Sequence, residues 1–458
     1  MSGRFGVPSA ALGGVAHCFA LSGGIAAAAS DLPTLGRGIA VAHLQGGYGT
    51  VIVQPASGSP VAAVELWFRA PSVGFGAKPL PSVARLAAQT VASSDPLVGS
   101  SLGDRVNAVG GKLAINAYGD SVSVAALVPA AAARDIVKSM TIAFFSPVVT
   151  DAGFTSAVRD VTMEALFAGF DPEAVVRDAV FEALFKSGPE HYSPLGSTKD
   201  VGAVTIEDVR SFAQRAFRAQ NAVLVISGAV DQSVATAASK GRPGAGTEPP
   251  AFESPAPSAV AASPEPVKRS FDEPAGGIGW VGPAIAQQDE ATAMDFIADY
   301  LFRPDSGVVS RVVADAYPGA FVSGQFITLH DPGVLFVAYG GGDPTALSTL
   351  VDKSLASMKV PLDPIVFARA RDAFMYHLLS DLQTPTELAD NFGWYSVEGN
   401  AEYAPGVDGA SGAYFKAAQM LTPASVASVA EKYLAGPSAS ALLQPDAKKP
   451  APAKGSAS

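Results

Sequence analysis

The sequence predicts an α+β protein built from two similar domains, each a mostly antiparallel sheet with helices on one face. Runs rich in β-branched and aromatic residues, typical of strands, alternate with segments whose apolar residues recur every three or four positions, as in amphipathic helices. These segments follow one another as strands, helices, strands and helices. Similar patterns return in the second half of the chain, which indicates an internal duplication.

Length and composition agree with this fold class and exclude some functions. The chain has 458 residues, of which 48% are hydrophobic and 16% charged, so it can bury the cores of more than one domain. A net charge of -11 argues against a nucleic-acid partner, which requires clustered basic residues. Cys18 is the only cysteine, so neither a disulfide nor a cysteine-based zinc site can form within the chain.

Residues 1–30 form a leader that we expect to be an export signal. They contain no acidic side chain, Arg4 lies near the start, and an apolar region rich in Gly and Ala covers 7–29. The mature protein is then expected to be periplasmic or extracellular. A mitochondrial-type presequence and a disordered leader are the alternatives. No other stretch is long and apolar enough to span a bilayer, so we expect no transmembrane segment in the mature chain.

The pattern predicts the elements of the first half in order. Strands are expected at 38–43, 50–54, 61–68, 113–116, 121–127 and 222–227. Helices are expected at 80–91, 102–109, 130–145 and 154–167, from Asp171-Pro172 onward, and at 209–217.

The duplication is visible in how the helices begin. Thr205, followed by two acidic residues, is a predicted N-cap for the helix before the last strand of the first half. Thr422 has the same place before a predicted helix at 426–434. Pro172 and Pro385, at nearly the same separation, begin a second matching pair of helices.

We therefore divide the chain into a leader at 1–30, an N-terminal domain at 31–238, a linker at 239–266, a C-terminal domain at 267–445 and a tail at 446–458. The linker is rich in Pro, Ala, Ser and Gly, which predicts a semi-rigid, solvated segment. The tail has the same composition with three lysines and is expected to be a disordered, solvated end.

The helix at 80–91 has polar positions that decide its chemistry. In the inverted zinc motif His-x-x-Glu-His, two imidazoles four residues apart hold the metal and the Glu activates a bound water. At this spacing the helix has Arg85, Ala88 and Gln89. A guanidinium has no lone pair for a metal, alanine has no functional group, and glutamine is a poor zinc ligand.

Several blocks, taken together, resemble the insulinase and mitochondrial processing peptidase family of zinc peptidases. After the helix at 80–91 they are Asn107-Ala-Val-Gly-Gly-Lys-Leu113, Tyr192-Ser-Pro-Leu-Gly196 and Asn221-Ala-Val-Leu-Val225. The resemblance covers 35–443. It implies two similar domains that face each other in a clam-shell.

The resemblance also implies where the catalytic residues of the family fall. Its first histidine falls on Arg85, its catalytic glutamate on Ala88 and its second histidine on Gln89. The third zinc ligand falls on Glu164, which is still acidic, but a lone Glu does not make a metal site. In the substrate-gripping segment of the second half, no Arg precedes the glycine and Phe321 stands where the Tyr should be. We therefore expect no catalytic residue, no metal and no cofactor.

Other candidate residues have structural explanations. Four histidines lie far apart and form no close ligand pair, and we expect them to be structural; they are His43, His191, His330 and His377. The aromatic patch at 391–395 is expected to pack in the core, with partner contact as the alternative. The glycines at 340–342 lack the Lys-Ser/Thr of a phosphate loop and predict a turn.

The sequence thus predicts a non-catalytic homologue of this peptidase family. We expect it to pair with a catalytically intact family member, to hold peptide in a shared chamber, or to scaffold a larger assembly. In some bacterial pairs of the family the inactive member supplies the substrate grip, and the loss of that grip here favours scaffolding. The alternative is a structural subunit like the core subunits of respiratory complex III, which resemble this family and have also lost the zinc motif. An enzyme with another site is a third hypothesis, which no residues at ligand or triad spacing support.

Overall fold

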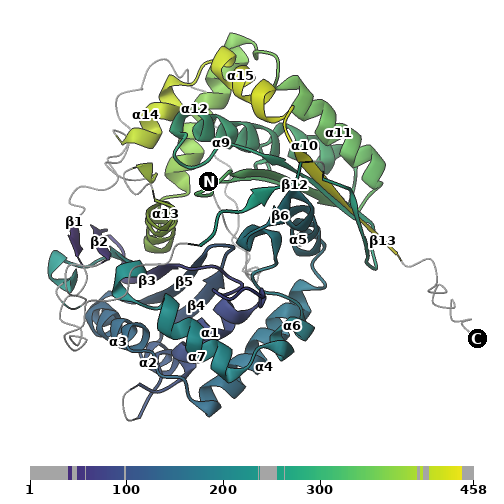
Figure 1. Ribbon diagram of the computed structural model, residues 1–458. Coiled ribbons are helices and arrows are strands. Elements are labelled where there is room, and N and C mark those ends of the chain that lie inside the picture. Colours follow the sequence, from purple (N-terminus) through teal and green to yellow (C-terminus); the bar gives the residue numbers. More distant parts are fainter. Residues whose placement is uncertain are drawn as a thin grey trace, which may run out of the picture.

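The computed structural model describes residues 40–43, 49–56, 58–96, 99–235, 237, 255–262, 264–399, 403–405 and 412–445. The expected export signal and the expected C-terminal tail lie outside these residues. Two sheets with helices organise the described chain into a lower and an upper half (Figure 1). The predicted α+β class with two mostly antiparallel sheets is confirmed.

The first sheet has six strands in the order β1-β2-β7-β3-β5-β4. Their bounds are β1 Ala40–His43, β2 Thr50–Pro55, β3 Val61–Arg69, β4 Lys112–Ala117, β5 Ser121–Pro129 and β7 Ala222–Gly228. All neighbours are antiparallel except β2 and β7, which run parallel with Val51 opposite Leu224.

The second sheet repeats this arrangement in the order β11-β12-β10-β13-β9. The strands are β9 Val267–Ser270, β10 Ala275–Val281, β11 Phe321–Ile327, β12 Val334–Gly340 and β13 Ser438–Gln444. When β9, β13, β10, β12 and β11 are aligned with β2, β7, β3, β5 and β4, the two orders coincide. The one parallel pair, β9 with β13, then falls on the one parallel pair of the first sheet.

Each half supplies helices to the outer face of its own sheet. In the first half these are α1 Val83–Ser93, α2 Leu102–Ala108, α3 Ala133–Phe145, α4 Asp151–Ala168, α6 Thr198–Ala203 and α7 Ile206–Ala216. In the second half they are α9 Gln288–Phe302, α10 Val308–Ala316, α11 Pro344–Ser357, α12 Pro364–Ser380, α14 Ala413–Met420 and α15 Pro423–Tyr433. Successive side chains of β3 point to opposite faces of the sheet. Val64, Leu66 and Phe68 therefore point to the same face and pack in the hydrophobic core between the first sheet and these helices, called the first core below.

Two further helices are exchanged between the halves. Helix α5 (Pro172–Leu184), from the first half of the chain, packs on β10, β12 and β13 of the second sheet. Helix α13 (Pro385–Val397), from the second half, packs on β3 and β7 of the first sheet. Figure 1 shows both helices between the two halves, which face each other as the resemblance implied.

Glycines permit both exchanged contacts. A Cβ on Gly277 would lie 2.4 Å from Val176 of α5, and one on Gly279 would lie 2.6 Å from Val180. On α13, a Cβ at Gly393 would come within 1.9 Å of Nε1 of Trp67. Side chains at these three positions would therefore keep the exchanged helices away from the sheets.

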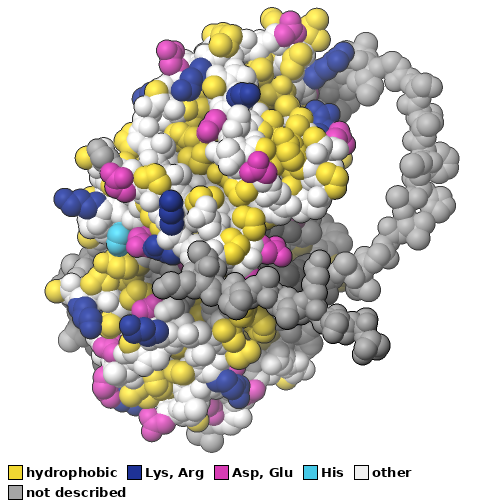
Figure 2. All heavy atoms as spheres, turned by 90° about the vertical axis from the view of Figure 1, so that its right-hand side faces the viewer, with side chains coloured by type: hydrophobic (Ala, Val, Ile, Leu, Met, Phe, Trp, Pro, Cys, Tyr) yellow, Lys and Arg dark blue, Asp and Glu magenta, His cyan; other side chains and the backbone are white. Residues whose placement is uncertain are grey.

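The segments between the halves contain short elements as well. Within the expected linker, β8 (Ala259–Val260) pairs antiparallel with β6 (Phe185–Ser187). Part of the expected linker therefore forms a β-strand. None of the helices that the structure describes is long and apolar enough to cross a membrane. On the face shown in Figure 2, basic side chains are scattered among acidic and hydrophobic ones.

Candidate functional site

Helix α1 is the element that would position the metal motif of the family. It packs against α4 and α7, and Val83, Leu86 and Val91 are buried in the first core. Its N-cap, Ser82, has a left-handed backbone with φ of 74° and donates its hydroxyl hydrogen to the carbonyl of Leu195. The Pro-Leu-Gly block of the resemblance therefore contacts the start of α1.

The structure brings three of the predicted site residues together. Nη2 of Arg85 lies 2.7 Å from Oε2 of Glu164 on α4, and its Nη1 donates to Oε1 of Gln89 at 3.0 Å. Arg85 is only 9% exposed, whereas the Glu164 side chain is 43% exposed. The carboxylate of Glu164 is therefore neutralised by the guanidinium of Arg85.

These side chains do not fit the zinc ion that the fold family implies. Arg85 offers no lone pair, and its fixed positive charge beside Glu164 would repel a cation. Ala88 is fully buried in the core, so no acid or base is present at that position. Among the residues that the structure describes, no group of three His, Cys, Asp or Glu side chains is arranged to hold a metal ion.

Phe321 lies away from this network, in the other half. It is the first residue of the edge strand β11 and pairs with Gly340 on β12. Its half-buried ring packs against the core formed around α5. A phenylalanine there has no hydroxyl with which to hold a substrate.

The predicted histidines have separate surroundings. Nδ1 of His330 donates to the carbonyl of Glu398 at 2.9 Å, and Nδ1 of His191 donates to the carbonyl of Phe185 at 2.6 Å. His43 is in β1, and its side chain lies outside the described residues. The glycines at 340–342 end β12, and Gly341 has a φ of 72°, so the predicted turn is confirmed.

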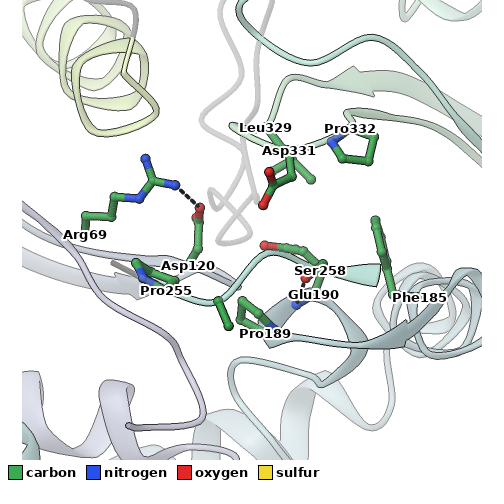
Figure 3. A pocket seen from close by; sticks show the side chains of 11 residues that line it. Arg69, Asp120, Phe185, Pro189, Glu190, Pro255, Ser258, Leu329, Asp331 and Pro332 are labelled. Carbon is green, nitrogen blue, oxygen red and sulfur yellow. Dashed lines mark hydrogen bonds and ion pairs between the residues drawn. The ribbon is translucent and has the colours of Figure 1, made fainter. Parts of the chain in front are cut away.

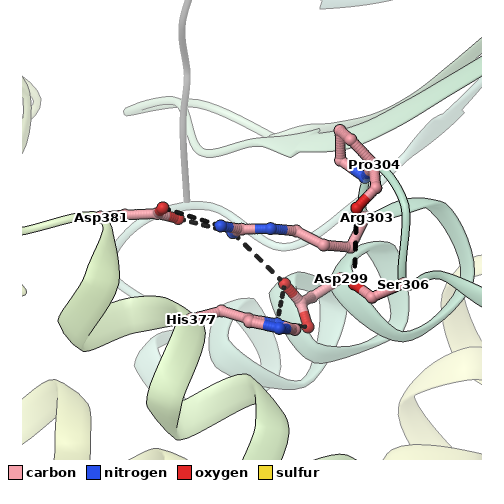
Figure 4. Close-up of polar contacts among 6 residues, drawn as sticks. All are labelled: Asp299, Arg303, Pro304, Ser306, His377 and Asp381. Atoms are coloured by element: carbon pink, nitrogen blue, oxygen red, sulfur yellow. Dashed lines mark hydrogen bonds and ion pairs between the residues drawn. The ribbon is translucent and has the colours of Figure 1, made fainter. Parts of the chain in front are cut away.

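A partly buried ion-pair network involves the remaining histidine (Figure 4). Nδ1 of His377 on α12 lies 2.9 Å from Oδ2 of Asp299 on α9, and Asp299 also pairs with Arg303 at 3.6 Å. Arg303 donates two parallel hydrogen bonds to Asp381, at 2.6 and 2.8 Å. Burial acts to raise the pKa of Asp381, but the hydrogen bonds and the positive charge of Arg303 act in the opposite direction, and the pKa lies below its usual value.

This network corresponds in position to the Arg85 pair of the first half. Glu164 precedes Pro172 by eight residues, and His377 precedes Pro385 by eight residues (172 − 164 and 385 − 377). In both halves, an ion pair joins the long helix before the exchanged helix to another helix of the same half. Both pairs link helices of the outer layer, which is a structural role.

A second polar cluster, which the sequence analysis did not find, lies in a pocket at the junction of the halves (Figure 3). Asp120, Glu190 and Asp331 line it together with Arg69, whose Nη2 lies 3.6 Å from Oδ2 of Asp120. Burial raises the pKa of Glu190 well above its usual value, and the charges of Asp120 and Asp331 raise it further. These residues come from four separate segments, so no spacing in the sequence signals them.

The aromatic patch at 391–395 packs in the interior, as predicted, but between the halves. Trp394 of α13 makes edge contacts with Trp67 and Tyr118 of the first half, with ring centroids 6.1 and 5.0 Å apart. Its Nε1 donates to the carbonyl of Thr328 in the second half at 2.9 Å. Trp67 and Tyr118 stack with an interplanar angle of 11°.

Comparison with known proteins agrees with this geometry. Residues 203–372 match the family described as the Peptidase M16 inactive domain. No curated protein matches the chain. The matched range begins after α1, so the interpretation of the metal site rests on the side chains of α1 and α4 themselves.

Solved structures share the fold over almost the whole chain. A protease from Helicobacter pylori is 17% identical, covers 90% of this chain and 100% of its own, and superposes with a TM-score of 0.77. A putative M16-like peptidase from Alicyclobacillus acidocaldarius is 18% identical, with 91% and 100% covered and a TM-score of 0.73. A chain of complex III2 from Candida albicans, bound to Inz-5, is 14% identical, with 89% and 96% covered and a TM-score of 0.72.

The resemblance found in the sequence is therefore confirmed. Residues 203–372 match the Peptidase M16 inactive domain, and the chain as a whole shares the two-half fold of solved M16-like peptidases.

Proposed function

We propose that this protein is a non-catalytic subunit that pairs with, or scaffolds, a catalytically intact M16 peptidase. The observation that carries the proposal is the Arg85–Glu164 ion pair, because the resemblance places two of the family's metal ligands at these two positions. A chain that keeps the whole fold but has Ala88 at the place of the water-activating glutamate has no general base at this site.

An exposed apolar stripe on α4 supports a partner. The stripe consists of Met163, Leu166 and Phe167 on α4 and Phe170 two residues after its end, and these side chains are between 42% and 67% exposed. The opposite face of α4 is also apolar, because Ala157 and Val161 are buried in the core. A helix that is apolar on two faces is usually covered on both, so the stripe supports a protein contact there.

The partner is identified by affinity purification of the tagged full-length protein from its own source, with mass spectrometry of the co-eluting proteins. We expect an M16 homologue with an intact His-x-x-Glu-His motif. Peptidase activity of the complex should be unchanged by Glu164→Gln in this chain, because the metal belongs to the partner. Activity that is lost with Glu164→Gln would overturn the proposal.

Paired surface variants test the stripe. Phe167→Ser with Phe170→Ser should reduce recovery of the homologue, since the two largest apolar side chains of the stripe are removed. Ile365→Ser with Val366→Ser, on the exposed surface of α12, is the matched control and should leave recovery unchanged. Equal recovery with both double variants would place the contact elsewhere.

The alternative function is a structural subunit of a membrane respiratory complex. The likeness to a chain of complex III2 supports it, and that likeness is nearly as high as those to the peptidases. Cell fractionation distinguishes the two, because export of the chain favours the peptidase partner and co-purification with cytochromes favours the respiratory complex. We propose export, together with an ancient duplication that produced the two sheets of equal strand order.

A further inference from the structure

The two exchanged helices are held by opposite kinds of polar contact. On α5, Glu182 pairs with Arg269 of β9 at 2.5 Å, and Glu173 accepts a hydrogen bond from Ser323 of β11 at 2.9 Å. On α13 and the residue after it, carboxyl groups meet other carboxyl groups of the first half. Glu182 and Glu173 of α5 therefore have basic or hydroxyl partners, whereas the acids at the α13 contact face other acids.

The first acid contact joins Glu398, directly after α13, to Asp120 in the turn between β4 and β5. Both are buried, at 1% and 8% exposure, and their carboxyl groups hydrogen-bond to each other, which requires one shared proton. Oε2 of Glu398 also accepts from the backbone N–H of His330 at 2.7 Å. Burial raises the pKa of both carboxyl groups, and the charge of Asp120 raises that of Glu398 further.

A second pair of interacting acids lies earlier in the chain on α13 and consists of Glu65 of β3 and Asp390 of α13. Glu65 of β3 is 2% exposed, and its Oε2 accepts from Nε1 of Trp67 at 3.2 Å. Burial raises the pKa of Glu65 well above its usual value, and the charge of Asp390 on α13 raises it further. Tyr118 is buried beside the same two acids, and burial raises the pKa of its hydroxyl as well.

The surrounding charges do not neutralise the junction. Four ionisable side chains face the Asp120–Glu398 pair. They are Arg69 of β3, Glu190, and His330 and Asp331 of the loop after β11. Arg69 lies 3.6 Å from Asp120 and also donates to the carbonyl of Val397 at 3.5 Å. One arginine and one exposed histidine therefore face four carboxyl groups at this end of α13.

We propose that the junction of α13 with the first sheet is a pH-responsive contact between the halves. It is closed while the Asp120–Glu398 pair holds its shared proton and Glu65 is protonated, and it loosens when these protons are lost. Like charges in a buried site repel strongly, whereas the contacts of Glu182 with Arg269 and of Glu173 with Ser323 on α5 need no proton on the carboxyl group. Loss of the protons therefore opens one exchanged contact and leaves the other in place.

The sign of the effect follows from linkage. The folded protein binds the shared protons more tightly than the unfolded chain, whose carboxyl groups titrate near about 4. The stabilisation is fully present below that pH and is lost as the pH rises toward the raised folded-state pKa of these groups.

Hydrogen exchange of the full-length protein between pH 5.5 and 9 tests the proposal. After correction for the intrinsic exchange rate, protection of α13 should fall at least about tenfold relative to α5, equivalent to one pKa unit of differential stabilisation. Tryptophan emission is a second readout in a Trp280→Phe background, because the other two tryptophans, Trp67 and Trp394, both lie at the junction. Their emission should shift to the red over the same pH range.

Variants assign the effect to the named acids. Glu65→Gln with Glu398→Gln should keep α13 protected at pH 9, since an amide can donate where the proton was shared. Glu182→Gln on α5 is the matched control and should leave the pH profile of α13 unchanged. Equal loss of protection in α5 and α13, or protection of α13 that does not depend on pH in the wild-type protein, would overturn the proposal even if the double variant fails to fold.

Discussion

Nη2 of Arg85 lies 2.7 Å from Oε2 of Glu164, and this contact joins α1 to α4. The buried guanidinium has a charged partner at one end and the amide oxygen of Gln89 at the other. An ion pair thus joins two helices at the positions on which the resemblance places zinc ligands of the family.

Substitution of Glu164 and substitution of Arg85 should lower the free energy of unfolding by different amounts. Glu164→Ala leaves a buried guanidinium without its carboxylate and should lower the free energy of unfolding by roughly 1–3 kcal/mol. Arg85→Met should cost less than about 1 kcal/mol, because water solvates the half-exposed Glu164 and methionine suits a buried site. Urea unfolding of both variants and of the double variant measures the coupling. A double variant that loses the sum of the two single costs would contradict this account.

The close approach of α13 to the first sheet predicts a severe effect of one methyl group. Gly393→Ala places Cβ against the indole of Trp67 and should lower the stability by about 3 kcal/mol or more, despite the better helix propensity of alanine. Gly202→Ala in α6 is the control, since no atom lies within 4 Å of the new Cβ. It should be neutral or stabilise by up to about 1 kcal/mol. Equal melting temperatures for the two variants would refute the contact.

Asp295 predicts a pH dependence in the second half. Burial raises its pKa to about 7, and Tyr414 donates to its Oδ2 at 2.7 Å. Because the folded-state pKa exceeds the unfolded value, its contribution to stability is present near pH 4 and is lost as the pH rises to 7. Relative to Asp295→Asn, the wild-type protein should lose up to about 4 kcal/mol between pH 4.5 and 8. Chemical denaturation at both pH values checks this, and a constant difference between the proteins would be the opposite result.

The repeated helix starts predict matched cap effects. The side chains of Thr205 and Thr422 accept from the N–H groups of Asp208 and Ser425, at 3.2 and 3.0 Å. Thr205→Ala and Thr422→Ala should each cost about 1 kcal/mol. Thr349→Ala, in the exposed middle of α11, is the control and should have little effect. Thermal unfolding of the three variants measures the difference, and a Thr349→Ala cost equal to the others would argue against a capping effect.

Local signals predicted much of this structure. The N-caps at Thr205 and Thr422 and the Pro172 and Pro385 helix starts are confirmed, because caps depend only on neighbouring residues. Most strand ends lie within two residues of those predicted, since alternation of buried residues marks a strand directly. The placement of Arg85 near Glu164 came from the family resemblance, which carries long-range information that a single pattern lacks.

The exchange of α5 and α13 was not predicted. The residues that permit it are Gly277, Gly279 and Gly393. In the sequence alone, a glycine within a strand or a helix indicates only a locally less stable position. The acid pairs at the α13 junction join residues far apart in the chain, such as Glu65 and Asp390. Residues that meet only through tertiary packing leave no periodic trace, so the sequence alone does not locate them.

The most direct test of the central claim is the zinc content of the purified full-length protein, measured by mass spectrometry of the metal after incubation with excess zinc and desalting. The account predicts far less than one zinc per chain, with the same value for wild type and Glu164→Gln. About one zinc per wild-type chain, lost in Glu164→Gln together with a peptidase activity, would show that the site is a working metal centre and contradict the account.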